Sequence, residues 1–279
     1  MALGARRRIG IMAPASPVAP ELAARVVALN AERLGDAAPE LVFHPQCFLS
    51  DGHFAGADAV REDALVELAN DPSLDAVWAA RGGYGAARIA EGALNRFTDV
   101  AHGKRWLAYS DGGALLAGLQ ARGYANVAHG SLPADLNREG GEAAVERALR
   151  WLALDDPSGL EPAYAADPKP TLAFNIAVLS SILGTPLEPR CEGRVLMLEE
   201  VSEHLYAIDR YLFQITSTPA VRTVAGVRLG RFNDIPQNDR PFGETPEAMM
   251  CRWCARSGIP YLWTADIGHD AANRIVPFS

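Results

Sequence analysis

Residues 105–119 read RWLAYSDGGALLAGL, and their order predicts a strand, a sharp turn and a helix. Arg105–Tyr109 is a short, mostly apolar run of the kind that forms a buried strand. Ser110 and Asp111 follow at once, and small and apolar residues then continue to Leu119, which favours a helix. The stretch is therefore one strand–helix unit, and such units build parallel sheets when they are repeated.

The same alternation of strand and helix runs through the first half of the chain. Apolar runs predict strands at Ile9–Ala13, Glu40–His44, Asp75–Ala80, Arg105–Tyr109 and Asn126–His129. The pattern of the segments between and after them predicts helices at Glu21–Leu34, Ala57–Asn70, Ala86–Glu91, the stretch ending at Leu119, and Glu142–Leu154. These units predict an α/β domain with a parallel, doubly wound sheet over residues 1–154.

The pattern changes after a stretch rich in proline and acidic residues, which we assign as a linker over residues 155–169. Beyond it we expect a second α/β domain over residues 170–279. Its predicted helices are Asn175–Leu183, Tyr206–Thr216 and Pro246–Arg256, and its predicted strands are Arg194–Leu198, Val221–Leu229 and Pro260–Thr264.

The composition is that of a folded globular protein: 279 residues, of which 49% are hydrophobic and 22% charged. The net charge of −8 disfavours nucleic acids and anionic membrane surfaces as partners, because both are negatively charged. The apolar run Ile9–Ala13 is shorter than the roughly 7–15 residues of a signal-peptide core, and no stretch approaches the roughly 18 apolar residues of a membrane span. We therefore expect a cytoplasmic protein.

The four cysteines do not predict a disulfide framework. Cys251 and Cys254 form a CxxC pair within a predicted helix, but a zinc site needs about four ligands, and Cys47 and Cys191 are isolated in the sequence. The favoured interpretation is two half-buried helix thiols, and we expect no metal.

Three polar features lie at the ends of predicted strands: the turn Arg81–Gly85, the pair Ser110-Asp111, and His129, which is a candidate for the lining of a site there. Ligands of open α/β sheets bind beyond the carboxyl ends of the strands. Ser110 lies between small residues in A-Y-S-D-G, which is similar to a nucleophile elbow with alanine as its first residue. Such a serine exposes its hydroxyl above the sheet, close to free N–H groups of the following helix. The alternative is that Ser110 only caps that helix, and the local sequence leaves both interpretations open.

The turn Arg81–Gly85 reads RGGYG, and its glycines allow the backbone to approach a ligand closely. Gly82 or Gly83 could supply a second N–H group to an oxyanion beside Ser110. The alternatives are a plain strand-to-helix turn, which would need glycine as well, or half of a dinucleotide site. The last is disfavoured because the turn is not G-x-G-x-x-G and follows the third strand. We expect no cofactor.

A serine nucleophile needs a base and a carboxylate to orient that base. His269 lies in a glycine-containing loop after the predicted strand Pro260–Thr264, although an ordinary surface histidine would fit there as well. Glu199 and Glu200 follow an apolar strand, and strand alternation sends them to opposite faces. One of them can then face the cleft, while the other is expected to be solvated.

At this point the sequence resembles the LD-carboxypeptidases, also called muramoyltetrapeptide carboxypeptidases, a family of serine peptidases. The resemblance covers nearly the whole chain and rests on six motifs in order. They are APASP (13–17), RGGYG (81–85), YSD (109–111), NIAVLSSILGTP (175–186), LMLEEVSEHLYAIDR (196–210) and GH (268–269).

The resemblance implies Ser110 as nucleophile, His269 as general base and Glu199 as its orienting carboxylate. It implies oxyanion donors in the backbone N–H groups of Asp111 and of a glycine of the 82–83 pair, for which we take Gly83. Arg81 and Tyr84 are our candidates for substrate contacts, and Arg81 could receive a terminal carboxylate because arginine offers a two-pronged donor. The implied fold is a flavodoxin-like N-terminal domain plus a smaller, swivelling β/α C-terminal domain, with the cleft between them and a homodimer as the assembly.

The implied activity is hydrolysis of an L,D peptide bond, with release of a C-terminal D-amino acid from murein peptides during peptidoglycan recycling. One alternative is an amide hydrolase similar to the microcin C immunity proteins, which would need an aromatic platform for a nucleotide base, and Trp151 and Trp263 are candidates for it. The other alternative is a relative that binds peptides and does not turn them over.

Overall fold

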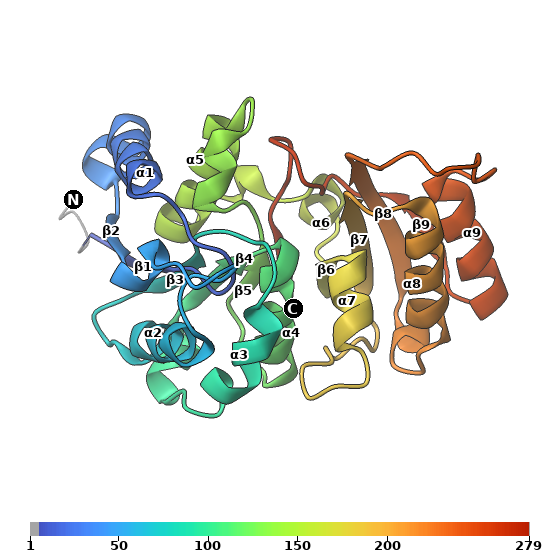
Figure 1. Ribbon diagram of the computed structural model, residues 1–279, viewed down its shortest axis with the longest axis horizontal. Coiled ribbons are helices and arrows are strands. Elements are labelled where there is room, and N and C mark those ends of the chain that lie inside the picture. The colour runs from blue at the N-terminus through green and yellow to red at the C-terminus, as the bar shows by residue number, and fades with distance from the viewer. Residues whose placement is uncertain (1–5, 279) are drawn as a thin grey trace.

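The computed structural model describes residues 6–278, and these residues form two sheets that lie side by side (Figure 1). The first sheet has the order β10-β5-β4-β3-β1-β2. Its strands are β1 (Arg8–Met12), β2 (Glu40–Phe43), β3 (Ala76–Ala79), β4 (Arg105–Ala108), β5 (Val127–His129) and β10 (Val276–Phe278). Strands β1 to β5 are parallel in the order 2-1-3-4-5, which is the flavodoxin-like arrangement, so the predicted doubly wound α/β fold is confirmed.

Helices cover both faces of the first sheet, with α1 and α5 on one side and α2, α3 and α4 on the other (Figure 1). Their bounds are α1 (Pro20–Leu34), α2 (Asp58–Asn70), α3 (Ala86–Leu94), α4 (Gly113–Ala121) and α5 (Gly141–Leu154). Each begins close to where the apolar periodicity predicts a helix. The reason is visible in α1, where Leu22, Val26 and Leu29 recur at helical spacing and are buried.

The second sheet has the order β6-β7-β8-β9 and is parallel throughout. Its strands are β6 (Thr171–Asn175), β7 (Val195–Val201), β8 (Gly226–Asn233) and β9 (Tyr261–Thr264), and its helices are α7 (Ile176–Ile182), α8 (Leu205–Ser217) and α9 (Pro246–Ser257). Strand β6 was not predicted. The predicted strand Val221–Leu229 is wrong at its start, because Val221–Thr223 form a 3₁₀ turn and the strand begins at Gly226.

The proline-rich stretch between the sheets contains a 3₁₀ turn (Pro157–Gly159) and the short helix α6 (Pro162–Ala166). Its Glu161 is buried, and its carboxylate accepts hydrogen bonds from the backbone of Tyr164 at 2.9 Å and of Asp266 at 3.1 Å. This stretch is therefore tied to the loop that follows β9.

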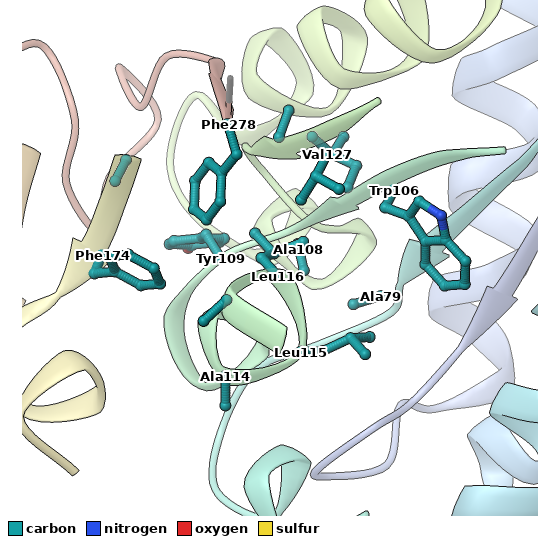
Figure 2. Close-up of a cluster of buried hydrophobic side chains, with 14 of the residues drawn as sticks. Ala79, Trp106, Ala108, Tyr109, Ala114, Leu115, Leu116, Val127, Phe174 and Phe278 are labelled. Carbon is teal, nitrogen blue, oxygen red and sulfur yellow. The ribbon is translucent and has the colours of Figure 1, made fainter. Parts of the chain in front are cut away.

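The C-terminal strand β10 returns to the first sheet and pairs antiparallel with β5, so that Val276 lies opposite His129. Phe278 meets Phe174 of β6 edge to face, with the ring centroids 5.2 Å apart, beside the core around β4 and α4 (Figure 2). The core is consequently continuous between the two sheets. This return path also carries residues 266–275 past the carboxyl end of β4.

Candidate active site

Ser110 stands on a sharp turn between β4 and α4, and its backbone is in the left-handed region with φ +57°. A side chain on Gly112 would place its Cβ 2.7 Å from the Cβ of Ala108, so the turn needs small residues on both sides. The residue that caps α4 is Gly112, and the Ser110 hydroxyl contacts His269 instead. The geometry is thus that of a nucleophile elbow, and the alternative of Ser110 as a helix cap is wrong.

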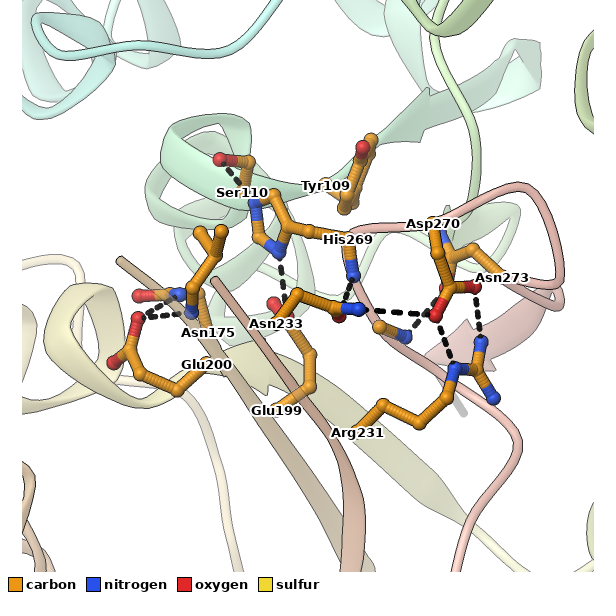
Figure 3. A network of polar contacts seen from close by, with 12 residues as sticks. Tyr109, Ser110, Asn175, Glu199, Glu200, Arg231, Asn233, His269, Asp270 and Asn273 are labelled. Atoms are coloured by element: carbon orange, nitrogen blue, oxygen red, sulfur yellow. Dashed lines mark hydrogen bonds and ion pairs between the residues drawn. The ribbon is translucent and has the colours of Figure 1, made fainter. Parts of the chain in front are cut away.

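The structure brings Ser110, His269 and Glu199 together in one chain of hydrogen bonds (Figure 3). His269 Nε2 lies 2.9 Å from Ser110 Oγ, and His269 Nδ1 lies 2.5 Å from Glu199 Oε2. A carboxylate only accepts hydrogen bonds, so Nδ1 carries the proton and Nε2 is free to accept that of the hydroxyl. Glu199 is 0% exposed and His269 5% exposed, which shields this chain from water.

The loop that carries His269 is held on both of its sides. From β8, the Asn233 amide oxygen accepts the His269 N–H at 2.9 Å, and Arg231 donates to the Asp270 carboxylate at 2.8 Å (Figure 3). From the first half of the chain, Arg138 Nη1 donates to the His269 carbonyl oxygen at 2.7 Å. These three supports could not be predicted from the sequence, because none of them follows a recognisable local motif.

His129 does not line the cavity, contrary to our expectation. Its ring is fully buried behind Tyr109, with the ring centroids 5.4 Å apart, and burial lowers its pKa, so the imidazole is neutral. Its Nε2 lies 3.0 Å from Asn273 Oδ1, which also accepts the Gly268 N–H at 3.2 Å. His129 therefore supports the His269 loop from beneath.

Glu200 is buried as well, so the expectation that the second glutamate is solvated is wrong. Its Oε1 accepts from Asn175 Nδ2 at 2.5 Å, and its Oε2 accepts from the backbone N–H of Ala177 at 2.9 Å (Figure 3). The carboxyl group thereby satisfies the N-terminus of α7, which covers the other face of β7. Burial raises the pKa of Glu200 to about 7.

Glu200→Gln is expected to flatten the dependence of stability on pH between about 4.5 and 7. The folded state, with a pKa of about 7 against 4.5 for the ordinary group, holds the proton more tightly than the unfolded state. The contribution of Glu200 to stability is thus full below pH 4.5 and is lost as the pH rises through about 7. Between pH 5 and 8 the free energy of unfolding of the wild type, measured in urea, should fall by roughly 2 kcal/mol more than that of the variant. Equal losses in both proteins would contradict this assignment, and a constant offset from the altered hydrogen bonds would not affect the comparison.

The glycine turn lies directly against the nucleophile turn. A Cβ on Gly82 would lie 3.0 Å from both Cβ and Oγ of Ser110 and 3.9 Å from the Asp111 nitrogen, whereas Gly83, with φ +119°, backs onto Ser16. The Asp111 carboxylate accepts the Ala86 N–H at 2.7 Å at the start of α3. Burial raises the pKa of Asp111 to about 6. The Asp111 side chain therefore joins the two turns.

Gly82→Ala is expected to lower kcat at least 10-fold with little change in thermal stability. The added methyl group would crowd the Ser110 hydroxyl, and Ser110 cannot retreat because the elbow fixes its backbone. Gly103→Ala is the matched control, since nothing lies within 4 Å of a Cβ at that position. Steady-state kinetics and melting curves of both variants test this, and equal kcat values in the two would argue against it.

A cavity of about 730 Å³ opens beside Ser110 and His269, between the two halves of the chain. Arg25, Arg81 and Arg138 are among its lining residues, and Arg81 donates to the Pro17 carbonyl oxygen at 3.2 Å. Tyr84 is not in the wall. It is 56% exposed and packs loosely against the rings of its neighbours His53 and Phe54.

No tryptophan in the described part of the chain lines this cavity, so neither Trp151 nor Trp263 is placed as an aromatic platform within it. Cys251 and Cys254 are free thiols one turn apart on α9. Among residues 6–278 no group of three or more histidine, cysteine, aspartate or glutamate side chains could hold a metal ion. No helix in the same range has the length and apolar character needed to cross a membrane.

A hydroxyl on a strained elbow, an imidazole and a buried carboxylate in one hydrogen-bonded chain are the arrangement of serine hydrolases. Models of known families match both halves of the sequence: the LD-carboxypeptidase N-terminal domain over residues 9–130 and the LD-carboxypeptidase C-terminal domain over residues 170–279. The chain belongs to the LD-carboxypeptidase family, a family of serine peptidases.

The relatives that this chain resembles in sequence and in structure are consistent with this family. A candidate carboxypeptidase of Synechocystis sp. is 30% identical over 85% of this chain and 79% of its own length. A probable murein peptide carboxypeptidase of Bacillus subtilis is 27% identical over 96% and 86%. Among solved structures, the muramoyltetrapeptide carboxypeptidase of Oxalobacter formigenes has a TM-score of 0.79 at 22% identity, covering 97% of this chain and 93% of its own. A microcin C7 self-immunity protein in complex with aspartyl sulfamoyl adenosine has a TM-score of 0.77 at 16% identity, covering 99% and 92%.

Proposed function

We propose that this protein is a serine carboxypeptidase that hydrolyses an L,D peptide bond and releases a C-terminal D-amino acid from murein peptides, as in peptidoglycan recycling. The observation that carries the proposal is the hydrogen-bonded chain of Ser110, His269 and Glu199 at the wall of the cavity. The probable murein peptide carboxypeptidase of Bacillus subtilis, a relative over nearly the full chain, supports the choice of substrate class.

In the first half of the reaction, His269 Nε2 removes the proton of Ser110, and Oγ attacks the carbonyl carbon of the L,D bond. The backbone N–H groups of Asp111 and Gly83 hold the oxyanion, and Glu199 stabilises the imidazolium. His269 then protonates the nitrogen of the D-amino acid, and the carbon–nitrogen bond breaks. In the second half, a water molecule gives a proton to His269 and attacks the acyl carbon. His269 then returns the proton to Ser110 Oγ as the ester bond breaks, which frees Ser110 and the shortened peptide.

Arg81 and Tyr84 are proposed to contact the peptide, Arg81 from the cavity wall and Tyr84 from the surface beside it. We further propose that the protein acts in the cytoplasm as a homodimer. Its four free cysteines, three of them buried, suit a reducing compartment. Sedimentation velocity at several concentrations tests the dimer.

Labelling with a fluorophosphonate probe tests the enzymatic assignment. The wild type should react at a single serine, and Ser110→Ala should not react. Ser181→Ala is the matched control, because Ser181 is an exposed serine that bonds only to the Val178 carbonyl oxygen in its own helix. Absence of labelling in a folded wild type would favour the non-catalytic, peptide-binding alternative.

A second candidate is hydrolysis of an amide in a peptidyl-nucleotide, favoured by the likeness to the microcin C7 self-immunity protein over 99% of this chain. Against it stands the lack of a cavity-lining tryptophan within the described residues. Product analysis on a murein tetrapeptide and on a peptidyl-adenylate separates the two. Turnover of the tetrapeptide alone is the expected result.

A further inference from the structure

Arg138 is a cavity-lining residue that the mechanism above does not use. Its Nη1 donates to the carbonyl oxygen of His269 at 2.7 Å, and its Nε donates to Asp135 Oδ1 at 3.0 Å. Its side chain is still 38% exposed. A guanidinium has five N–H groups, so donors remain for a ligand in the cavity.

Buried residues fix the orientation of Arg138. Asp135 is 4% exposed, and its carboxylate accepts from the Tyr109 hydroxyl at 2.7 Å and from the Leu132 N–H at 2.8 Å. The Tyr109 ring, in turn, packs against the His269 ring with centroids 4.9 Å apart (Figure 3). Arg138, Asp135 and Tyr109 thus form a closed set of contacts with His269. An arginine held in this way loses little conformational freedom when it binds an anion.

The reaction of a carboxypeptidase determines where the terminal carboxylate of the substrate must lie. The leaving nitrogen receives its proton from His269, and the terminal carboxylate is attached to the carbon next to that nitrogen. The group that binds the carboxylate must therefore stand beside His269. Arg138 meets this condition because it bonds to the backbone of His269 itself, whereas Arg81 and Arg25 are anchored elsewhere, to Pro17 and to residues 136–137.

We propose that Arg138 binds the terminal carboxylate of the substrate and so restricts cleavage to the last residue of the peptide. This inference rests on the proposed function. Asp135 and Tyr109 act as positioning residues for Arg138. Arg81, whose place in the sequence made it a candidate for the same carboxylate, is the competing residue.

The test compares two peptides that differ only at the C-terminus, one ending in D-alanine and the other in D-alaninamide. Their dissociation constants are measured by calorimetry on Ser110→Ala protein, alone and combined with Arg138→Met, Arg138→Lys or Arg81→Met. The same peptides are assayed for hydrolysis with the wild type and with the Arg138 and Arg81 variants bearing Ser110. Melting curves check that each variant folds, and Arg138→Lys serves if Arg138→Met does not.

We expect Ser110→Ala protein to bind the acid about 10- to 100-fold more tightly than the amide, as for a charged hydrogen bond. Arg138→Met should abolish this preference by weakening the binding of the acid peptide alone. Arg138→Lys should reduce the preference, and Arg81→Met should retain it. Equal weakening of both peptides by Arg138→Met would show that Arg138 only supports the His269 loop, and loss of the preference in Arg81→Met alone would give the role to Arg81. Either result overturns the inference. If Ser110→Ala protein prefers the acid peptide but the wild type hydrolyses neither peptide, the proposed function is refuted while the role of Arg138 in binding is supported.

Discussion

Ser110→Ala is expected to lower kcat on a murein tetrapeptide by about 10⁴-fold or more, with a melting temperature within a few degrees of the wild type. The loss is large because the hydroxyl forms the covalent bond, and the imidazole and carboxylate have no other nucleophile to activate. Stability should change little because the hydroxyl makes its hydrogen bond to His269 at the cavity wall, and alanine keeps the Cβ that lies against the glycine turn. Release of D-alanine over long incubations is the measurement.

Combining Ser110→Ala with His269→Ala should cost almost nothing beyond the first change, because residues that act as one unit are strongly non-additive. Glu199→Gln alone should lower kcat by about 10³- to 10⁴-fold, since an amide can stabilise the wrong tautomer of His269. The assignment would be wrong if Ser110→Ala kept a tenth of the wild-type activity, or if the double variant showed the product of two independent losses.

The first sheet could be predicted well because its information is local. Each strand is an apolar run followed by a turn and an amphipathic helix, and the right order then follows from a small set of allowed topologies. Strand β10 carries no such signal: it is three residues long, contains Pro277, and exists because β5 offers an unpaired edge and Phe174 offers a partner for Phe278. Strand β6 was missed for a related reason, since its five residues follow a proline and merge with the next helix without a turn.

The candidate site also contains residues that could be predicted from local sequence and residues that could not. Ser110 could be found because an elbow has a local signature, and Glu199 and His269 because each comes at or after the carboxyl end of a predicted strand and fits a family motif. What surrounds them depends on contacts between distant parts of the chain. Arg138 and Asn233 reach the same backbone segment from opposite sides, and no sequence pattern relates them. Strand alternation separated Glu199 from Glu200 correctly, but it could not show that the N-terminus of α7 would bury the second carboxyl group.

Arg61→Met is expected to lower the free energy of unfolding by about 3–5 kcal/mol, the largest effect on stability that we predict outside the hydrophobic core. Arg61 is 0% exposed although it is a charged residue in the first turn of α2. Its guanidinium donates to the carbonyl oxygens of Gly85 at 3.0 Å and Gly56 at 3.2 Å, and also to that of Pro14, and it pairs with Asp58. Methionine fills much of the volume but takes the donor away from the buried carbonyl groups of Pro14 and Gly56, each at a cost of about 1–3 kcal/mol before relaxation, whereas the Gly85 carbonyl group keeps the Arg88 N–H at 3.2 Å.

The matched control is Arg88→Met, which removes a second arginine from the same surroundings. Arg88 pairs with the same Asp58 at 2.7 Å and lies over the same Phe54 ring, 4.8 Å from its centroid, but its side chain is 45% exposed. An exposed pair contributes about 1 kcal/mol or less, so this variant should melt within about 3 °C of the wild type, against a drop of roughly 6–15 °C for Arg61→Met. Arg61 joins the loop after β1 to the carbonyl group of Gly85. At temperatures where the variant is still fully folded, Arg61→Met should therefore also have a lower kcat than the wild type, whereas Arg88→Met should keep the wild-type kcat. Equal melting temperatures for the two variants would show that the burial of Arg61 adds no stability. The glycine turn beside Ser110 would then have to be held by its other contacts, such as the Asp111 carboxylate at Ala86.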